Sequence, residues 1–214
     1  MIVNRTTTRD TFADAYGVHV KDAYELVKMA KKPEHNELGK LKITERVITY
    51  NNSDGNFYGE SHGYPDVLLD LSQLQPLLDQ LVNSERPFDK ERFKNFEMDM
   101  SPENYRSWFA RHSDNCHDII RLDETLKEIV GFGRICECSI DDDHKYLYVY
   151  NFVVSDKCRG KGIGKNMLQR FENVAFNTKC DYIVLSCYRV NKAIKLYKSL
   201  GFNEIKGYHE LWEQ

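Results

Sequence analysis

The chain has 214 residues, which suits one large domain or a standard domain with an extension. Its 41% hydrophobic and 29% charged residues are typical of a globular protein, and its net charge of -3 gives no electrostatic reason to expect nucleic acid or an anionic membrane as a partner. No apolar run approaches the roughly 20 residues of a membrane helix, and the polar start from Met1 to Asp14 lacks the core of a secretion signal. The sequence therefore predicts a cytoplasmic protein.

The cysteines give no sign of a metal site. The six are Cys116, Cys136, Cys138, Cys158, Cys180 and Cys187. Only Cys136 and Cys138 are close in sequence, and a strand would place both thiols on one face. Because no second close pair completes a ligand set, we predict reduced thiols with structural roles and no bound metal.

Residues 1–63 are predicted to form an N-terminal extension without a chemical motif. The segment from Arg9 to Lys31 has apolar residues at helical spacing, which predicts a helix. These residues are Phe12, Tyr16, Val20, Tyr24 and Val27. A strand is predicted from Leu41 to Tyr50, and a second strand from Phe57 to Glu60 follows a turn signal at 52–55. The expected extension is thus a helix and a hairpin.

Residues 64–214 are predicted to form the main domain, which opens with a short strand and two helices. Asp66 to Leu71 predict the strand, and Ser72 is a good N-cap for the first helix. The apolar positions of this helix are Leu74, Leu77, Leu78 and Leu81. The second helix is predicted from Pro102 to Arg111, with Ser101 as its cap.

The rest of the chain alternates strands with helices. Strands are predicted at 117–122, 129–140, 146–154, 182–187, 202–206 and 209–213. A glycine-rich loop at 159–164 opens one helix, and Asn191 caps another, which Gly201 ends. This order predicts a mixed α/β protein with a mostly antiparallel sheet.

The glycine-rich loop, Arg159-Gly160-Lys161-Gly162-Ile163-Gly164, has the chemistry of a phosphate site. The first amides of a helix have no intrahelical partner, and the helix dipole adds positive potential there. Glycines let several N–H groups approach one ligand, and Arg159 and Lys161 add charge. The alternative is a tight connection without a ligand. The Walker and dinucleotide-binding patterns are both absent.

Two motifs in this order resemble the GNAT superfamily of N-acetyltransferases. A strand, the loop Arg159 to Gly164 and a helix resemble the family's acyl-CoA loop, R/Q-x-x-G-x-G/A. The segment from Asn191 to Phe202 resembles the family's N-x-x-A-x-x-x-Y-x-x-x-G-F helix, except that Asn191 stands one place closer to Ala193. The resemblance is strong from about Cys116 to Phe202 and does not cover residues 1–63.

The resemblance implies a fold and a set of site residues. The expected fold is α/β, with a mixed, mostly antiparallel sheet, splayed central strands and helices on both faces, plus the N-terminal helix and hairpin. By resemblance, acetyl-CoA would be the co-substrate, and the loop would bind its pyrophosphate. Pantetheine would contact the backbone of Phe152, Val153 and Val154. The side chain of Asn191 would either contact pantetheine or cap its helix, and the sequence supports both roles equally.

By the same resemblance, Tyr197 would serve as general acid toward the departing thiolate; the alternative is a core aromatic. Cys187 lies near the expected cleft, but neither motif contains a histidine to activate it, so a covalent mechanism is not expected. Many relatives carry a glutamate on the strand before the loop, and residues 146–154 contain no carboxylate. Glu137, Asp118, Glu210 and the C-terminal carboxylate are other sources of a base, and none is assigned as a site.

The function implied is transfer of acetyl from acetyl-CoA directly to a primary amine of a small molecule, peptide or protein. The alternative is a non-catalytic acyl-CoA sensor or interaction module on the same fold. The segment from Asn83 to Met100 would form the wall of the acceptor site. The acceptor's identity is open, and so is a homodimer built through the N-terminal extension.

Overall fold

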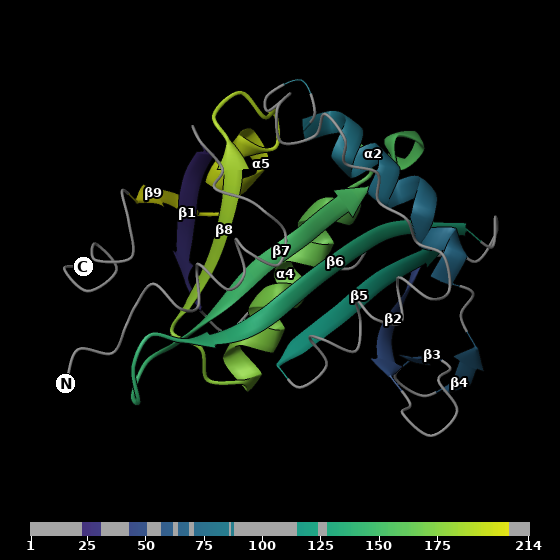
Figure 1. Cartoon of the computed structure of the whole chain (residues 1–214), viewed down its shortest axis with the longest axis horizontal. Helices are drawn as coiled ribbons and strands as arrows, with labels where there is room; N and C mark the ends of the chain where they lie inside the picture. Colours follow the sequence, from purple (N-terminus) through teal and green to yellow (C-terminus); the bar gives the residue numbers. More distant parts are fainter. Residues whose placement is uncertain are drawn as a thin grey trace.

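The computed structural model describes residues 23–30, 43–50, 57–61, 64–68, 71–85, 87, 115–123 and 128–205. The elements, in chain order, are β1 (Ala23–Met29), β2 (Ile43–Tyr50), β3 (Phe57–Ser61), β4 (Tyr64–Leu68), η1 (Leu71–Leu74), α2 (Gln75–Glu85), β5 (Cys116–Asp123), β6 (Glu128–Ser139), β7 (Lys145–Val154), η2 (Asp156–Cys158), α4 (Ile163–Asn177), β8 (Tyr182–Tyr188), α5 (Ile194–Ser199) and β9 (Asn203–Ile205) (Figure 1). Within these ranges, no helix is long and apolar enough to cross a membrane.

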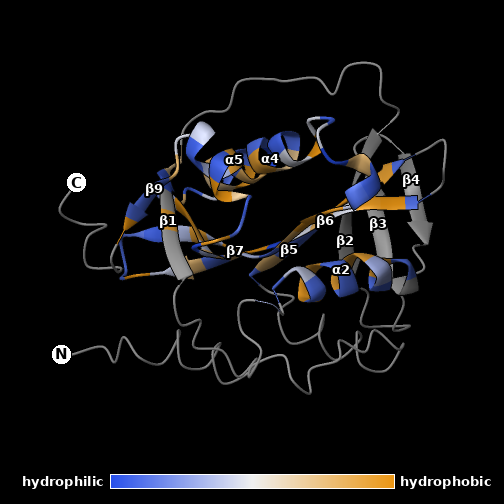
Figure 2. Cartoon of the chain, turned by 90° about the horizontal axis from the view of Figure 1, so that it is seen from above, coloured by the Kyte–Doolittle hydropathy of each residue, from blue (hydrophilic) through white to orange (hydrophobic). Residues whose placement is uncertain are grey.

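The strands of the described ranges form one nine-stranded sheet in the order β4-β3-β2-β5-β6-β7-β8-β1-β9. Neighbouring strands run antiparallel, except that β7 and β8 run parallel. Figure 2 shows α4 and α5 on one face of the sheet and α2 on the other. The predicted mixed, mostly antiparallel sheet with helices on both faces is therefore confirmed.

The helix α4 lies close to the sheet because two glycines of β6 face it. A Cβ atom at Gly131 would lie 2.8 Å from the sulfur of Met167, and a Cβ at Gly133 would overlap the ring of Phe171. Met167 and Phe171 are themselves completely buried, so the interior leaves no room for a larger residue on β6. This close packing fixes the position of α4 and of the loop that opens it.

The predicted helix from Arg9 to Lys31 is wrong at its C-terminal end. Residues Ala23–Met29 form β1, which pairs with β8 on one side and β9 on the other. The apolar spacing from Phe12 to Tyr24 is four residues, which is a multiple of the strand period as well as close to one helical turn, so it did not discriminate between the two. Leu26 is completely buried in the main core. The residues before Ala23 lie outside the described ranges.

Most other predicted elements match the structure. The predicted strand at 66–71 begins two residues earlier, at Tyr64, and Ser72 lies inside the 3-10 turn η1 rather than capping α2, which begins at Gln75. Leu74, Leu77 and Leu78 are buried as expected. The predicted helix at 102–111, the segment 83–100 beyond α2 and the predicted strand at 209–213 fall mostly outside the described residues.

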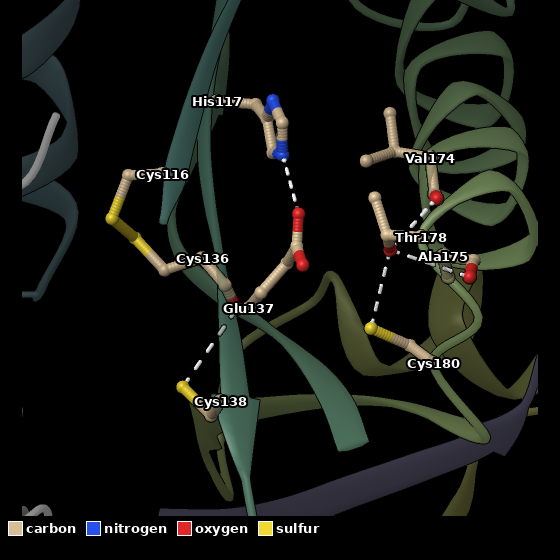
Figure 3. A network of polar contacts seen from close by, with 9 residues as sticks. All are labelled: Cys116, His117, Cys136, Glu137, Cys138, Val174, Ala175, Thr178 and Cys180. Atoms are coloured by element: carbon tan, nitrogen blue, oxygen red, sulfur yellow. Dashed lines mark hydrogen bonds and ion pairs between the residues drawn. A yellow bond between two sulfur atoms is a disulfide. The ribbon is translucent and has the colours of Figure 1, made fainter. Parts of the chain in front are cut away.

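The prediction that all six thiols are reduced is wrong for one pair. Cys116 and Cys136 face each other across β5 and β6 and form a disulfide, with Cα atoms 4.0 Å apart (Figure 3). The Glu137 N–H donates to the Asn115 carbonyl, which makes the cysteines a non-hydrogen-bonded pair, the position where facing side chains come closest. The sequence did not reveal this pair because its members are twenty residues apart.

A buried ion pair joins the same two strands. The Arg134 guanidinium donates two hydrogen bonds to the Asp118 carboxylate, at 2.7 and 2.6 Å, and both residues are almost completely buried. The two residues are direct partners in the β5–β6 register. A buried charge that loses its partner keeps its desolvation cost, so this pair constrains the centre of the sheet.

We predict that Asp118→Ala lowers the free energy of unfolding by about 3–5 kcal/mol, because it leaves Arg134 buried without its carboxylate. Urea unfolding measures the change. The double variant Asp118→Leu/Arg134→Met should recover most of the loss, since it removes both charges. Glu204→Ala, at the exposed pair with Arg189, should change the value by only about 0.5 kcal/mol. A small effect of Asp118→Ala would contradict the assigned role.

Candidate active site

The neighbouring strands β7 and β8 separate toward their C-terminal ends, which leaves a gap between them. The two strands pair only from Tyr146 with Tyr182 to Val149 with Leu185. Beyond that point β7 continues to Val154 beside β6, while β8 continues to Tyr188 beside β1. Figure 1 shows the two strand ends diverging, with α5 next to the end of β8. The central strands are thus splayed.

A β-bulge in β7 lies where the pairing with β8 ends. Arg134 pairs with Asn151 and Ile135 with Val149, so Tyr150 is an extra residue in β7. Bulges bend a strand and increase its local twist. The bulge therefore turns the end of β7 away from β8 and exposes one edge of its backbone.

The register shows which backbone groups of β7 face the gap. The Ser155 N–H donates to the Val130 carbonyl at 2.9 Å, so this pair is hydrogen-bonded. Because such pairs alternate along an antiparallel ladder, Val153 directs its N–H and C=O toward β6. Phe152 and Val154 direct theirs toward the gap. Of the three residues expected to contact pantetheine through their backbone, Phe152 and Val154 face the gap, whereas the backbone groups of Val153 face β6.

The glycine-rich loop connects the end of β7 to α4. Gly160 and Gly162 have φ angles of 75° and 83°, a left-handed region that other residues rarely adopt. A Cβ atom at either position would meet no protein atom within 4 Å. Gly162 is the N-cap of α4, and its carbonyl accepts from the Asn166 N–H. The amides of the first turn thus border open space that fits a phosphate group.

The other loop residues divide into exposed cations and packed residues. Arg159 and Lys161 are exposed, and Arg159 forms an ion pair of 2.7 Å with Asp156. Ile163 is buried in the core. A Cβ at Gly164 would lie 3.4 Å from Leu196 and 3.5 Å from Phe152, so this glycine serves the packing of α4 against α5 and β7.

Tyr197 lies beside the gap. Its ring centroid is 6.3 Å from that of Phe152 on β7 and 5.9 Å from that of Phe202, and the residue is buried. Burial raises the pKa of the phenol above its ordinary value, and the neighbouring Cys187 and Glu85 raise it further. Tyr197 therefore keeps its proton throughout the physiological pH range.

A model of the acetyltransferase (GNAT) family matches residues 78–202, which is more than half of the chain and includes α4, β8 and α5. The chain belongs to the GNAT family of acetyltransferases. The match begins within α2 and ends at Phe202, the last residue of the second motif. The resemblance inferred from the two motifs is thereby confirmed.

Curated GNAT relatives match only part of the sequence. A spermine/spermidine N(1)-acetyltransferase of Bacillus subtilis strain 168 is 34% identical over 80 residues, which is 35% of this chain and 53% of that protein. A probable spermine N(1)-acetyltransferase of Bacillus subtilis subsp. natto matches to the same extent. The chain thus matches about half the length of these relatives.

Solved GNAT structures share the fold. A tetramutant of a Bacillus halodurans protein superposes with a TM-score of 0.52 at 22% identity, covering 63% of this chain and 88% of that chain. An aminoglycoside acetyltransferase from an uncultured soil metagenomic sample gives a TM-score of 0.52 at 17% identity, covering 77% and 90%. At these identities the likeness is one of fold.

The second GNAT motif positions Tyr197 through its two ends. The Asn191 side chain, three residues before α5 begins at Ile194, accepts from the Ala193 N–H at 2.9 Å, so it stabilises the turn into the helix. At the other end, Gly201 has a φ of 87° and its N–H donates to the Lys198 carbonyl, while the Phe202 N–H donates to the Tyr197 carbonyl. These are the two bonds of a Schellman motif, which places Phe202 against the tyrosine ring.

The structure gives no support to the carboxylates that sequence reasoning considered on the neighbouring strands. Asp118 is paired with Arg134 inside the sheet. Glu137 forms a contact of 3.0 Å with His117 (Figure 3), and it pairs with Leu147 in the part of β7 that precedes the bulge. Asp118 aligns through Arg134 with Asn151 in the splayed part of β7, but its carboxylate is held by Arg134, whereas Glu137 aligns with the part of β7 that still pairs with β8. Glu210 and the C-terminus lie outside the described residues.

Two residues of α2 that the sequence motifs did not mark interact with groups at the gap. The Gln80 side chain donates to the Val154 carbonyl and accepts from the Asp156 N–H, both at 2.9 Å. Glu85, the last residue of α2, acts electrostatically on Tyr197 and Cys187. Glu85 falls within the 83–100 segment that was expected to form the acceptor wall, but nothing singled it out, and Gln80 has the sequence pattern of an ordinary polar position on a helix.

We predict that Cys187 resists alkylation in the folded protein. Burial raises the pKa of its thiol to about 12, so only about one molecule in 10⁴ carries the thiolate at pH 8. Iodoacetamide treatment followed by peptide mass spectrometry should leave Cys187 unmodified, whereas the same treatment in urea should modify it. Equal labelling in both conditions would contradict the burial and the raised pKa.

Proposed function

We propose that the protein transfers an acetyl group from acetyl-CoA directly to a primary amine. The observation that carries this proposal is the gap between β7 and β8, which opens directly beside the glycine-rich loop and Tyr197. Pantetheine would lie in the gap, where Phe152 would offer its backbone N–H and C=O and Val154 its N–H, because the Val154 carbonyl already accepts from Gln80. Arg159, Gly160, Lys161, Gly162, Ile163 and Gly164 form the loop that would bind the pyrophosphate, mainly through its amides.

Backbone amides at the edge of the gap would also serve the chemistry. As the amine attacks, negative charge develops on the thioester oxygen, and a fixed N–H donor lowers the energy of that state. The N–H groups of Phe152 and Val154 are held by the strand and need no reorganisation to donate. One of them would polarise the carbonyl.

Tyr197 would supply a proton to the leaving group. The neutral amine nitrogen forms a bond to the carbonyl carbon and releases a proton to water, the carbon–sulfur bond breaks, and the departing thiolate accepts a hydrogen bond from the phenol and then takes up a proton from solvent. Because burial raises the phenol's pKa, full proton transfer from it to a thiolate whose conjugate acid has a pKa of about 8.5 is uphill, and a strong hydrogen bond is the favoured form of assistance.

The names of the relatives support an amine as the acceptor. The two Bacillus subtilis proteins are named as acetyltransferases of spermine and spermidine. Polyamines are therefore the first acceptors to test, followed by aminoglycosides and peptide N-termini. Binding of acetyl-CoA without release of free CoA in the presence of any amine would favour the alternative, a non-catalytic acyl-CoA sensor.

We predict that saturating acetyl-CoA raises the midpoint of thermal unfolding, because a ligand that binds only the folded state stabilises it. Gly162→Ala should abolish most of this rise, because the new Cβ would occupy the space in which the pyrophosphate of acetyl-CoA is proposed to bind. Gly201→Ala is the matched control, because it imposes a similar left-handed strain of about 1–2 kcal/mol away from the loop. An unchanged rise in Gly162→Ala would place the donor elsewhere.

We predict that Tyr197→Phe separates chemistry from binding. The change keeps the ring that packs on Phe152 and Phe202, so the fold should persist. Loss of a hydrogen bond to a charged group is worth about 1.5–3 kcal/mol, so kcat and kcat/KM for the amine should fall together by about 10- to 150-fold. The affinity for acetyl-CoA, measured by calorimetry, should hardly change. Wild-type turnover would make Tyr197 a core aromatic.

A further inference from the structure

A buried arginine of β5 connects the middle of the sheet to the start of α4. Arg121 is only 3% exposed. Its register partner on β6 is Gly131, and the partner of Gly131 on β7 is Val154, so Arg121 belongs to the same row of the sheet as the last residue of β7. One of its hydrogen bonds runs from Nη2 to Oδ1 of Asn166, the fourth residue of α4, at 2.8 Å.

The glycine at position 131 makes this path possible. A Cβ atom at Gly131 would lie 3.3 Å from Cβ and 3.5 Å from Cγ of Arg121, as well as 2.8 Å from the sulfur of Met167. The stem of the arginine therefore passes through the space that a side chain of β6 would fill, on the face of the sheet that α4 covers (Figure 2). A larger residue at position 131 would block the arginine from reaching α4.

Asn166 joins this arginine to the glycine-rich loop. The Asn166 N–H donates to the carbonyl of Gly162, the N-cap of α4, at 3.0 Å. The backbone of Asn166 thus holds the end of the loop, while Arg121 holds its side chain. A shift of Asn166 would move the amides of the first turn of α4.

The charge of Arg121 opposes the helix dipole and suits an anionic ligand. A cation near the N-terminal end of a helix is unfavourable, because that end already carries positive potential. Burial of a guanidinium also has a desolvation cost that an apolar side chain of similar volume would not have. A buried cation in this place therefore fits a loop that binds an anion better than it fits a purely structural role.

We propose that Arg121 is a positioning residue for the donor. It holds Asn166 so that the amides of the glycine-rich loop converge on the pyrophosphate of acetyl-CoA, and its buried charge adds to their attraction for the two phosphates. This inference rests on the proposed function. Arg121 acts from beneath α4, without touching the donor.

Calorimetric titration of CoA, together with competition by pantetheine, tests this assignment. Arg121→Met retains most of the stem and removes the guanidinium, so CoA binding should weaken by about tenfold. Pantetheine lacks the pyrophosphate and should displace CoA with the same inhibition constant in the variant and in the wild type. Arg170→Met is the matched control, because it makes the same substitution one turn further along α4, and it should leave CoA affinity within about twofold of the wild type.

The asparagine provides a second, independent variant. Asn166 is partly exposed, so Asn166→Ala should fold even if Arg121→Met does not, and it removes the same hydrogen bond. It should also weaken CoA binding selectively. Because the two residues act as a unit, the double variant should bind CoA about as weakly as Arg121→Met alone.

The outcomes separate this inference from the proposed function. CoA affinity within about twofold of the wild type in both single variants would overturn the role of Arg121, and so would an equal loss of affinity for pantetheine or fully additive effects in the double variant. Absence of CoA binding to the wild type would overturn the proposed function, and this inference with it.

Discussion

The bulge at Tyr150 is the constraint on which the site depends. One extra residue in β7 shifts the register with β6, and the pairing with β8 ends at the preceding residue. The shift also decides which amides face the gap, because it moves Phe152 and Val154 onto the free edge. Without it, β7 and β8 could pair along their whole length and leave no exposed backbone. The site that we propose combines this gap with the glycine-rich loop and Tyr197.

The two faces of the sheet contribute different parts to the gap. On one face, Gly131 and Gly133 let α4 approach closely, which positions the glycine-rich loop, and the Schellman motif at Gly201 helps to hold Tyr197 near Phe152. On the other face, Gln80 ties α2 to the same strand end. Helices on both faces are thus held at the last residues of β7.

The sequence predicted the central strands, the loop and both motif helices, because their hydrophobic periods, glycines and caps are local signals. It failed where the deciding contact was distant in sequence. Ala23–Met29 read as helix, although pairing with β8 and β9 makes it a strand. The Cys116–Cys136 disulfide, the bulge at Tyr150 and the bridge from Gln80 depend on register or on contacts at least twenty residues apart. The resemblance, rather than any local signal, pointed to Tyr197 as a site residue.

Residue-resolved amide hydrogen exchange, followed by NMR with and without saturating CoA, tests the central claim most directly. If pantetheine pairs with the free edge of β7, the amides of Phe152 and Val154 should exchange at least about tenfold more slowly when CoA is bound. The Val153 amide, already bonded to β6, should exchange slowly in both states. Unchanged exchange at Phe152 and Val154 in a protein that demonstrably binds CoA would contradict the assignment of the gap as the donor site.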